Sequence, residues 1–312
     1  MGRYPIKREF FPFSRFTPPL GRRFLKFAAR FMNVPASVWR EEGITVAALR
    51  VPSYDGQEIP CLLITPEGVG DSAPCLIYYH GGGFVLKMSA YHCRNAIRYA
   101  KEARCKVVMP DYRLAPDFPF PIFFEDCYAA FCWVYDRAEE LGIDRARIGV
   151  GGDSAGGDLA AGVCMMAKDR HHPGSILLQL LMYPYLDARS CSESFRRYTD
   201  TPMWNSTLSK KVTPLTKPDR TSPCYLYYSP VEAEDLSGLP GAYIETAEFD
   251  CLHDDGILFA RRLREAGIAV ELNETVGTMH GFDIVTKAPT SVAAVDRRIE
   301  YLRGRFGEPV DG

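Results

Sequence analysis

A serine between glycines is the residue whose setting best suits nucleophilic chemistry. Ser154 is the centre of the pentapeptide Gly-Asp-Ser-Ala-Gly (152–156), which links an apolar segment, 147–152, to a run of small residues, 155–169. The first segment has the pattern of a strand and the second that of a helix. Glycines let the backbone turn sharply between them without a Cβ clash, so the hydroxyl can point away from the sheet. The pattern predicts that Ser154 is a nucleophile at a strand-to-helix turn.

A row of glycines offers the backbone amides that such a nucleophile needs. Residues 81–83 are all glycine and follow His80, directly after a short apolar segment. A bare backbone can approach a substrate closely, so we expect the amides of Gly82 and Gly83, joined by that of Ala155, to stabilise an oxyanion. The loop has neither pattern typical of dinucleotide or phosphate binding. His80 is predicted to hold the loop through side-chain hydrogen bonds rather than to act as a base.

The serine also needs a base, and the predicted elements separate one histidine from the other five. His280 precedes a glycine in a loop after the last predicted strand, so it can reach the sheet end where the serine stands. His92, in a predicted helix, and the pair 171–172, in a turn before a proline, are interpreted as surface residues. His253 begins a helix, from which it cannot easily meet both an acid at 250 and the serine. The predicted base is therefore His280.

An acid that orients this histidine is expected at the end of a neighbouring strand. Asp250 ends the segment 242–250 and lies near the loop that carries His280. In serine hydrolases such a carboxylate fixes the imidazole tautomer and stabilises its charged form. We therefore predict Asp250 as the acid. Three nearby carboxylates are competitors for this role: Glu248, Asp254 and Asp255.

The elements that must position these residues alternate between strand and helix patterns. This alternation predicts an α/β fold with a mainly parallel, eight-stranded sheet and helices on both faces. The first two strands are joined by a four-residue turn and are expected to form a hairpin. The predicted strands cover 44–53, 58–66, 75–80, 105–110, 147–152, 176–184, 242–250 and 269–276, and the predicted helices cover 90–104, 122–141, 155–169, 253–267 and 291–305.

Composition limits the kinds of partner. The 312 residues carry a formal net charge of -2, which gives no reason to expect nucleic acid. The ten cysteines include no Cys-x-x-Cys pair, so reduced, buried thiols in a cytoplasmic protein are expected rather than disulfides, and no metal site is predicted. The first residues do not resemble a secretory signal, and no segment approaches the roughly 18 apolar residues of a membrane helix.

Five motifs in the same order resemble the hormone-sensitive-lipase family (family IV) of bacterial carboxylesterases, which has the α/β-hydrolase fold. The resemblance implies hydrolysis of short- to medium-chain acyl esters through a Ser-His-Asp triad and an acyl-enzyme, a small-molecule ester as partner, and no cofactor. The sequence departs from the family pattern at four positions. The family usually has proline at the position of Cys251 and arginine near that of His253. It usually has asparagine or glutamate at the positions of Asp158 and Asp117. The motifs lie at 80–83, 111–116, 152–157, 250–254 and 280–282.

Two stretches lie outside the alternation and are expected to form a cap over one end of the sheet. The predicted organisation is an N-terminal cap segment, 1–42, and a catalytic domain, 43–312, with a cap insertion at about 185–218. Four aromatic residues of the first stretch are interpreted as a cap helix packed on the core; the alternatives are a lid over the acyl pocket, a membrane-surface contact and a homodimer contact. These residues are Phe10, Phe11, Phe13 and Phe16.

Two alternative functions belong to other classes. The same triad cleaves amides, so an amidase or peptidase fits the residues as well. A non-catalytic ligand-binding protein can also be built on this fold, although such proteins typically lack the histidine that His280 supplies here.

Overall fold

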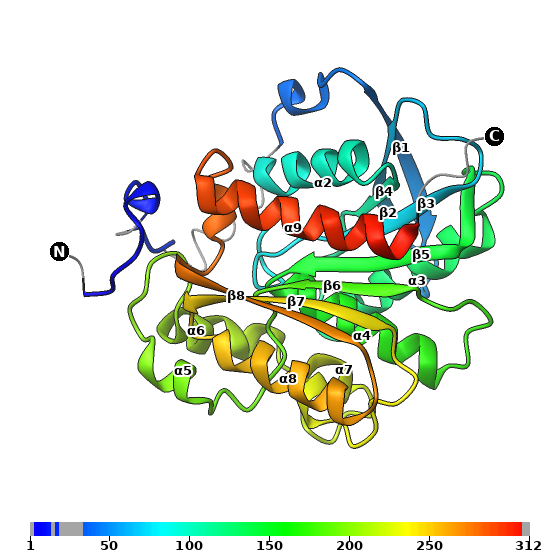
Figure 1. The fold of residues 1–312 in the computed structure, drawn as a ribbon. Helices are drawn as coiled ribbons and strands as arrows, with labels where there is room; N and C mark the ends of the chain where they lie inside the picture. Colours follow the sequence, from blue (N-terminus) through cyan, green and yellow to red (C-terminus); the bar gives the residue numbers. More distant parts are fainter. Residues whose placement is uncertain (1–2, 14–15, 19–33, 308–312) are drawn as a thin grey trace.

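One eight-stranded sheet forms the centre of the computed structural model, which describes residues 3–13, 16–18 and 34–307. Its strand order is β1-β2-β4-β3-β5-β6-β7-β8 (Figure 1). β2 pairs antiparallel with β1 and β4, and all other neighbours are parallel. The predicted sheet and its first hairpin are therefore confirmed. The strands are β1 (Ile44–Pro52), β2 (Glu58–Pro66), β3 (Ala73–Tyr79), β4 (Lys106–Pro110), β5 (Ile143–Asp153), β6 (Leu178–Met182), β7 (Gly241–Phe249) and β8 (Val270–Met279).

Helices cover both faces of this sheet (Figure 1): α2 and α9 lie on one face, and α3, α4 and α8 on the other. The five predicted helices are all present, but α3 ends five residues before position 141, because the chain must turn at Gly142 (φ +61°) into β5. The helices are α2 (Ala90–Glu102), α3 (Ile122–Asp136), α4 (Ala155–Asp169), α5 (Glu193–Arg197), α6 (Ser206–Thr216), α7 (Tyr225–Tyr228), α8 (His253–Glu265) and α9 (Pro289–Phe306), with short 3-10 helices η1 (Arg8–Phe10), η2 (Ala36–Trp39), η3 (Pro230–Glu232) and η4 (Phe282–Ile284).

The segment between β6 and β7, for which the sequence predicted no helices, contains α5, α6 and α7. The segment before β1 contains the three-residue η1, and it runs beside the end of β8, where the Lys7 amide donates to the Gly277 carbonyl at 2.9 Å (Figure 1). Phe10 is fully buried there, whereas Phe11 and Phe16 are 55% and 46% exposed. Both segments approach the sheet at the end where the predicted site residues lie.

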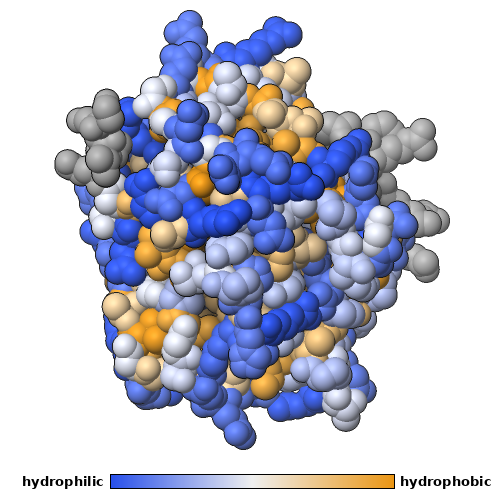
Figure 2. Space-filling model, turned by 90° about the vertical axis from the view of Figure 1, so that its right-hand side faces the viewer, coloured by the Kyte–Doolittle hydropathy of each residue, from blue (hydrophilic) through white to orange (hydrophobic). Residues whose placement is uncertain are grey.

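The core follows from the sheet topology. Every residue of β3, β4 and β6 is buried, as expected for parallel strands that are covered on both faces. On the face drawn in Figure 2, hydrophobic residues form small patches between hydrophilic ones. Within the described part of the chain, none of the helices is long and apolar enough to cross a membrane. All ten cysteines are free and seven are buried, but Cys191 is exposed.

Glycines let α4 approach the sheet closely just after Ser154. A Cβ on Gly156 would lie 2.0 Å from the Tyr79 carbonyl oxygen, and one on Gly152 would lie 2.3 Å from the backbone of Gly156. Real Cβ atoms do not approach other atoms this closely, so the start of α4 can rest against β3 and β5 only if both residues are glycine. The glycines of the motif therefore serve helix packing as well as the turn.

Gly156→Ala is expected to lower the free energy of unfolding by at least about 3 kcal/mol, because α4 must move away from the backbone of β3. Gly304→Ala in α9 is the matched control, since a Cβ there meets nothing within 4 Å. It is expected to raise stability by about 0.5–1 kcal/mol through helix propensity. Urea denaturation of both variants measures the difference. Equal stabilities would contradict the packing role of Gly156.

Candidate active site

Ser154 occupies the turn between β5 and α4 in a conformation that few residues adopt. Its φ of +55° and ψ of -118° lie outside the regions that are usual for a residue with a side chain. Hydrogen bonds hold it there: its amide donates to the Met182 carbonyl at 2.8 Å, and its carbonyl accepts from the Tyr185 amide at 3.1 Å. The backbone on both sides of the turn is thus anchored to the end of β6 and to the loop that follows it.

The structure brings together the three residues predicted as nucleophile, base and acid. His280 Nε2 lies 2.9 Å from Ser154 Oγ, and His280 Nδ1 lies 2.6 Å from Asp250 Oδ2. The carboxylate can only accept, so Nδ1 carries the proton, and the bare Nε2 can accept from the serine hydroxyl. Asp250 is fully buried, and its other oxygen accepts from the Leu252 amide at 3.0 Å. These contacts orient the imidazole toward the serine.

The competing carboxylates make other contacts. Glu248 accepts from the Gly277 amide at 2.7 Å, and Asp254 accepts from the Ser194 amide at 2.8 Å. Asp255 is buried in α8, where burial, with Asp187 and Asp250 adding to it, raises its pKa well above the ordinary value. Among the described residues, the side chain of His280 forms hydrogen bonds with Asp250 and Ser154, so Asp250 is the carboxylate positioned to orient it.

The glycine loop after β3 is held by hydrogen bonds to the peptide that joins residues 80 and 81. The Tyr112 hydroxyl donates to the His80 carbonyl at 2.6 Å, and the Gly81 amide donates to Asp153 Oδ1 at 3.1 Å. His80 Nδ1 lies 2.8 Å from the Gly81 carbonyl, which can only accept, so Nδ1 carries the proton and donates. The structure thus places the His80 side chain where the sequence predicted it, against its own loop.

These contacts also aim the next two amides. In a trans peptide the N–H points opposite to the C=O. The Gly81 carbonyl faces His80, and the Gly82 carbonyl accepts from the Val85 and Leu86 amides at 3.1 and 3.0 Å. The N–H groups of Gly82 and Gly83 therefore point away from these partners, and both residues line a cavity at Ser154. Ala155 is the first residue of α4, whose N–H has no partner within the helix.

His92 is not the surface residue that the sequence predicted: it is 3% exposed. The interpretation was wrong because α2 buries a stripe through positions 92, 95, 96, 99 and 100, the spacing of one helix face. His92 Nδ1 accepts from the Ser89 amide at 2.9 Å, which leaves Nε2 to face Asp153 at 3.3 Å. The apolar residues of that stripe were the signal that could have placed His92 inside.

The carboxylate of Asp153 accepts several hydrogen bonds beneath the glycine loop. Besides the Gly81 amide and His92, its carboxylate accepts from the Tyr78 hydroxyl at 2.7 Å and the Tyr91 hydroxyl at 2.9 Å. Burial alone would raise the pKa of Asp153, but the attraction of His92 and these hydrogen bonds hold the pKa well below its ordinary value. A fixed negative charge thus anchors the loop from the residue that precedes Ser154.

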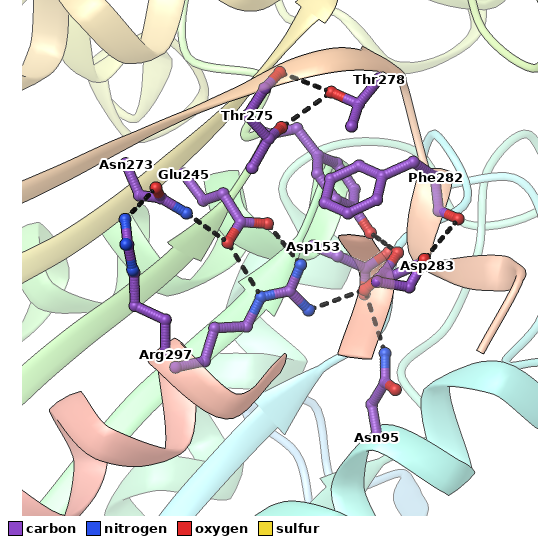
Figure 3. A network of polar contacts seen from close by, with 12 residues as sticks. Asn95, Asp153, Glu245, Asn273, Thr275, Thr278, Phe282, Asp283 and Arg297 are labelled. Atoms are coloured by element: carbon purple, nitrogen blue, oxygen red, sulfur yellow. Dashed lines mark hydrogen bonds and ion pairs between the residues drawn. The ribbon is translucent and has the colours of Figure 1, made fainter. Parts of the chain in front are cut away.

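A buried ionic network supports the His280 loop (Figure 3). Asp283, three residues after His280, accepts from Arg298 Nη1 at 2.7 Å, from the Tyr183 hydroxyl at 2.6 Å and from Asn95 Nδ2 at 3.0 Å. Arg298 is fully buried and also pairs with the buried Glu245. Sequence reasoning missed this network, because its five members come from five separate elements and loops.

Ser154 lies between two cavities. The larger cavity has a water-accessible volume of about 320 Å³, and its lining includes His280 and Tyr183. The smaller cavity has a water-accessible volume of about 20 Å³. Its walls include the buried side chains of Phe84, Tyr185, Tyr228 and Leu252. A group bound to the serine could therefore extend to either side. In the described ranges, three or more His, Cys, Asp or Glu residues nowhere come together as they would around a metal ion.

Comparisons with known proteins find a matching family and similar esterases. Residues 76–284 match the alpha/beta hydrolase fold family. The chain is 39% identical to carboxylesterase NlhH of Mycobacterium tuberculosis over 262 residues (81% of each chain), and 32% identical to an ethyl acetate hydrolase of Pseudomonas putida over 251 residues (78% of this chain and 77% of the relative). The solved structure of a bacterial heroin esterase superposes with a TM-score of 0.88 and 31% identity, covering 97% of this chain and 99% of that one.

The stability of the protein is expected to depend on pH through His80. Burial, with the nearby His92 adding to it, lowers the pKa of His80 from 6.5 to about 3. Between these values the unfolded chain binds a proton that the folded chain does not, so stability falls as the pH falls, by up to about 1.4 kcal/mol per pH unit. In His80→Asn, whose amide can still donate near the position of Nδ1, the loss between pH 6.5 and 4.5 should be smaller by about 2 kcal/mol.

Urea denaturation at several pH values measures this dependence. His171→Asn is the control, because His171 is exposed and its replacement should leave the slope unchanged. If His80→Asn and the parent protein lose stability equally between pH 6.5 and 4.5, His80 is not a buried neutral imidazole.

Arg298→Met is expected to lower the free energy of unfolding by about 3–5 kcal/mol, because it leaves the carboxylates of Glu245 and Asp283 buried without their cation. The activity should also fall, since Asp283 anchors the loop of His280. Arg261→Met is the control: Arg261 is exposed and pairs with Glu265 on the surface of α8, so its loss should cost less than about 1 kcal/mol. Chemical denaturation and steady-state kinetics test both variants, and similar losses in the two would contradict the role of the network.

Proposed function

We propose that this chain, which belongs to the alpha/beta hydrolase fold family and is a carboxylesterase of its hormone-sensitive-lipase class, uses Ser154, His280 and Asp250 as its catalytic triad. One observation carries the proposal: hydrogen bonds of 2.6 and 2.9 Å run from the buried Asp250 through His280 to the hydroxyl of Ser154. A serine hydroxyl is a weak nucleophile, and this chain supplies the base that activates it together with the acid that orients the base.

In the first half of the reaction, Ser154 Oγ attacks the carbonyl carbon of the ester while His280 Nε2 takes up the hydroxyl proton. The carbonyl oxygen becomes an oxyanion, which the amides of Gly82, Gly83 and Ala155 stabilise. One such donor contributes roughly 3–4 kcal/mol in other serine hydrolases. Because the loop carbonyls are already hydrogen bonded, these amides need little reorganisation when the charge develops. His280 then protonates the alkoxide oxygen, the C–O bond breaks, and the alcohol leaves an acyl group on Ser154.

The second half of the reaction repeats these roles with water. His280 Nε2 removes a proton from a water molecule, whose oxygen attacks the acyl carbon of the acyl-enzyme. The same amides hold the second oxyanion. The proton returns from His280 to Ser154 Oγ as the C–O bond to the serine breaks, which releases the carboxylic acid and restores the enzyme.

The cap segments, 1–42 and about 185–218, are proposed to form the walls of the substrate site. Phe16 and Pro18 from the first segment, and Met203 and Trp204 from the second, line the larger cavity at Ser154. The Met203 amide donates to the Phe16 carbonyl at 2.7 Å, which joins the two segments over the site. Residues 1–2, 14–15 and 19–33 of the predicted first cap segment lie outside the described part of the chain.

The substrate partner is a small-molecule ester, and we propose acyl groups of short to medium length. A cytoplasmic location agrees with ten free cysteines, and it stays a prediction, as does a homodimer. An amidase or peptidase that uses the same triad is the alternative within hydrolases. Hydrolysis rates of an ester and of the anilide with the same acyl group distinguish the two activities.

Ser154→Ala is expected to lower kcat for p-nitrophenyl acetate by up to about 10⁶-fold, because no other group can form the acyl-enzyme. Its unfolding midpoint in urea should stay close to that of the parent protein. Ser237→Ala, at an exposed turn, is the matched control and should keep full activity. Substantial hydrolysis by a folded Ser154→Ala protein would remove Ser154 from the nucleophile role.

A further inference from the structure

One side chain separates the two cavities that meet at Ser154. Only Gly83, Ser154 and Trp204 line both of them among the described residues. Gly83 has no side chain and Ser154 has a small one, so the wall between the cavities consists of the indole of Trp204. Its ring centroid lies 6.1 Å from that of His280. Trp204 therefore lies beside the imidazole that contacts the Ser154 hydroxyl, and between the two directions in which a substrate can extend.

Hydrogen bonds and packing hold Trp204 in this position. Its indole Nε1 donates to Ser209 Oγ at 2.8 Å, and its carbonyl accepts from Thr201 Oγ1 at 3.0 Å. The indole also rests on the glycine loop, since a Cβ built on Gly83 would lie 2.9 Å from Trp204 Cη2. Gly83 has a φ of +62°, so neither the conformation nor the space at this position admits a side chain. The indole of Trp204 is thus held in a fixed position, and it packs on the glycine loop where that loop has no side chain.

The location of His280 indicates which cavity receives which half of the ester. The leaving oxygen must accept a proton from His280 Nε2, so the alcohol leaves on the side of the imidazole. His280 lines the larger cavity and is absent from the described lining of the smaller one. The larger cavity therefore suits the alcohol, and the acyl group on Ser154 extends toward the smaller cavity on the other side of Trp204.

The sizes of the two cavities then define a substrate class. The water-accessible volume of the smaller cavity, about 20 Å³, is slightly more than one water molecule requires. The smaller cavity therefore takes a group the size of a methyl. Its end is closed by rings that pack on one another: the ring centroids of Phe84 and Tyr185 each lie 5.4 Å from that of Tyr228. The larger cavity has about 320 Å³ and is lined by apolar side chains such as Leu86, Met203 and Ile284.

We propose that Trp204 is the specificity-determining wall of this enzyme and narrows the short- to medium-chain range given above to esters that join a small acyl group, such as acetyl, to a bulky apolar alcohol. The inference rests on the proposed function, because the assignment of the two sides uses Ser154 and His280 in their catalytic roles. The similarity to an ethyl acetate hydrolase fits an acyl group of this size.

Two isomeric esters test the proposal directly, because they exchange the bulky group between the two sides at constant composition. The parent enzyme should hydrolyse 2-phenylethyl acetate with a kcat/KM at least about tenfold higher than that for ethyl phenylacetate, the order of discrimination that a pocket gives against one or more extra carbons. Trp204→Ala joins the cavities and should reduce this ratio at least about tenfold. The rates are followed by titration of the released acid.

A second variant guards against misfolding of Trp204→Ala. Val212→Ala removes two methyl groups from a wall of the smaller cavity alone, and it should raise kcat/KM for p-nitrophenyl butyrate relative to the acetate. Trp133→Ala is the matched control for loss of an indole, since Trp133 lies in α3 and is not among the described residues that line either cavity; it should keep the parent ratio.

The outcomes separate this inference from the proposed function. Unchanged ester ratios in folded Trp204→Ala and Val212→Ala would overturn the role of Trp204, provided that hydrolysis still requires Ser154. A parent enzyme that prefers ethyl phenylacetate would overturn the assignment of the two sides. Hydrolysis that persists in Ser154→Ala would instead contradict the catalytic triad itself.

Discussion

The strained turn at Ser154 is the constraint on which the rest of the site depends. A φ of +55° presents the hydroxyl above the sheet edge, and it can be kept only if α4 starts immediately and close to β3. That closeness requires glycine at positions 152 and 156. It also places Asp153 beneath the glycine loop, where the carboxylate holds the Gly81 amide. One backbone conformation thus positions both the nucleophile and the loop that faces it.

The loop of His280 is fixed by different means, and the two kinds of support explain what the sequence could predict. Ser154 and His280 follow predicted strands and Asp250 ends one, so parallel topology brings them to one edge, and local motifs identify them. The partners of Asp283 are Arg298, Tyr183 and Asn95, which lie 15, 100 and 188 residues away along the chain. Such contacts depend on how helices pack on the sheet, so they cannot be predicted from a local sequence pattern.

Burial also changes how charged residues should be interpreted. Asp158 lies one turn after Ser154 in α4 and is fully buried, and its carboxyl oxygens have no hydrogen-bond partner among the described residues. Burial, with Asp255 adding to it, raises the pKa of Asp158 well above the ordinary value, which favours the neutral acid. A neutral carboxylic acid has nearly the shape of a carboxamide, which makes this departure from the family pattern a conservative one. His92 is a second case in which burial changes the interpretation. It was predicted to lie on the surface, but it is a buried partner of Asp153.

The glycine loop carries a consequence for how this enzyme can diverge. Gly82 and Gly83 adopt φ values of +123° and +62°, and a Cβ on either would meet a neighbour at 2.9 Å. The part of the site that handles the developing charge therefore has almost no freedom to vary. Descendants that acquire new substrates must do so by changing residues supplied from elsewhere, such as those of α6 and the segment before β1. Reactivity is conserved in the backbone, while selectivity can evolve in the side chains around it.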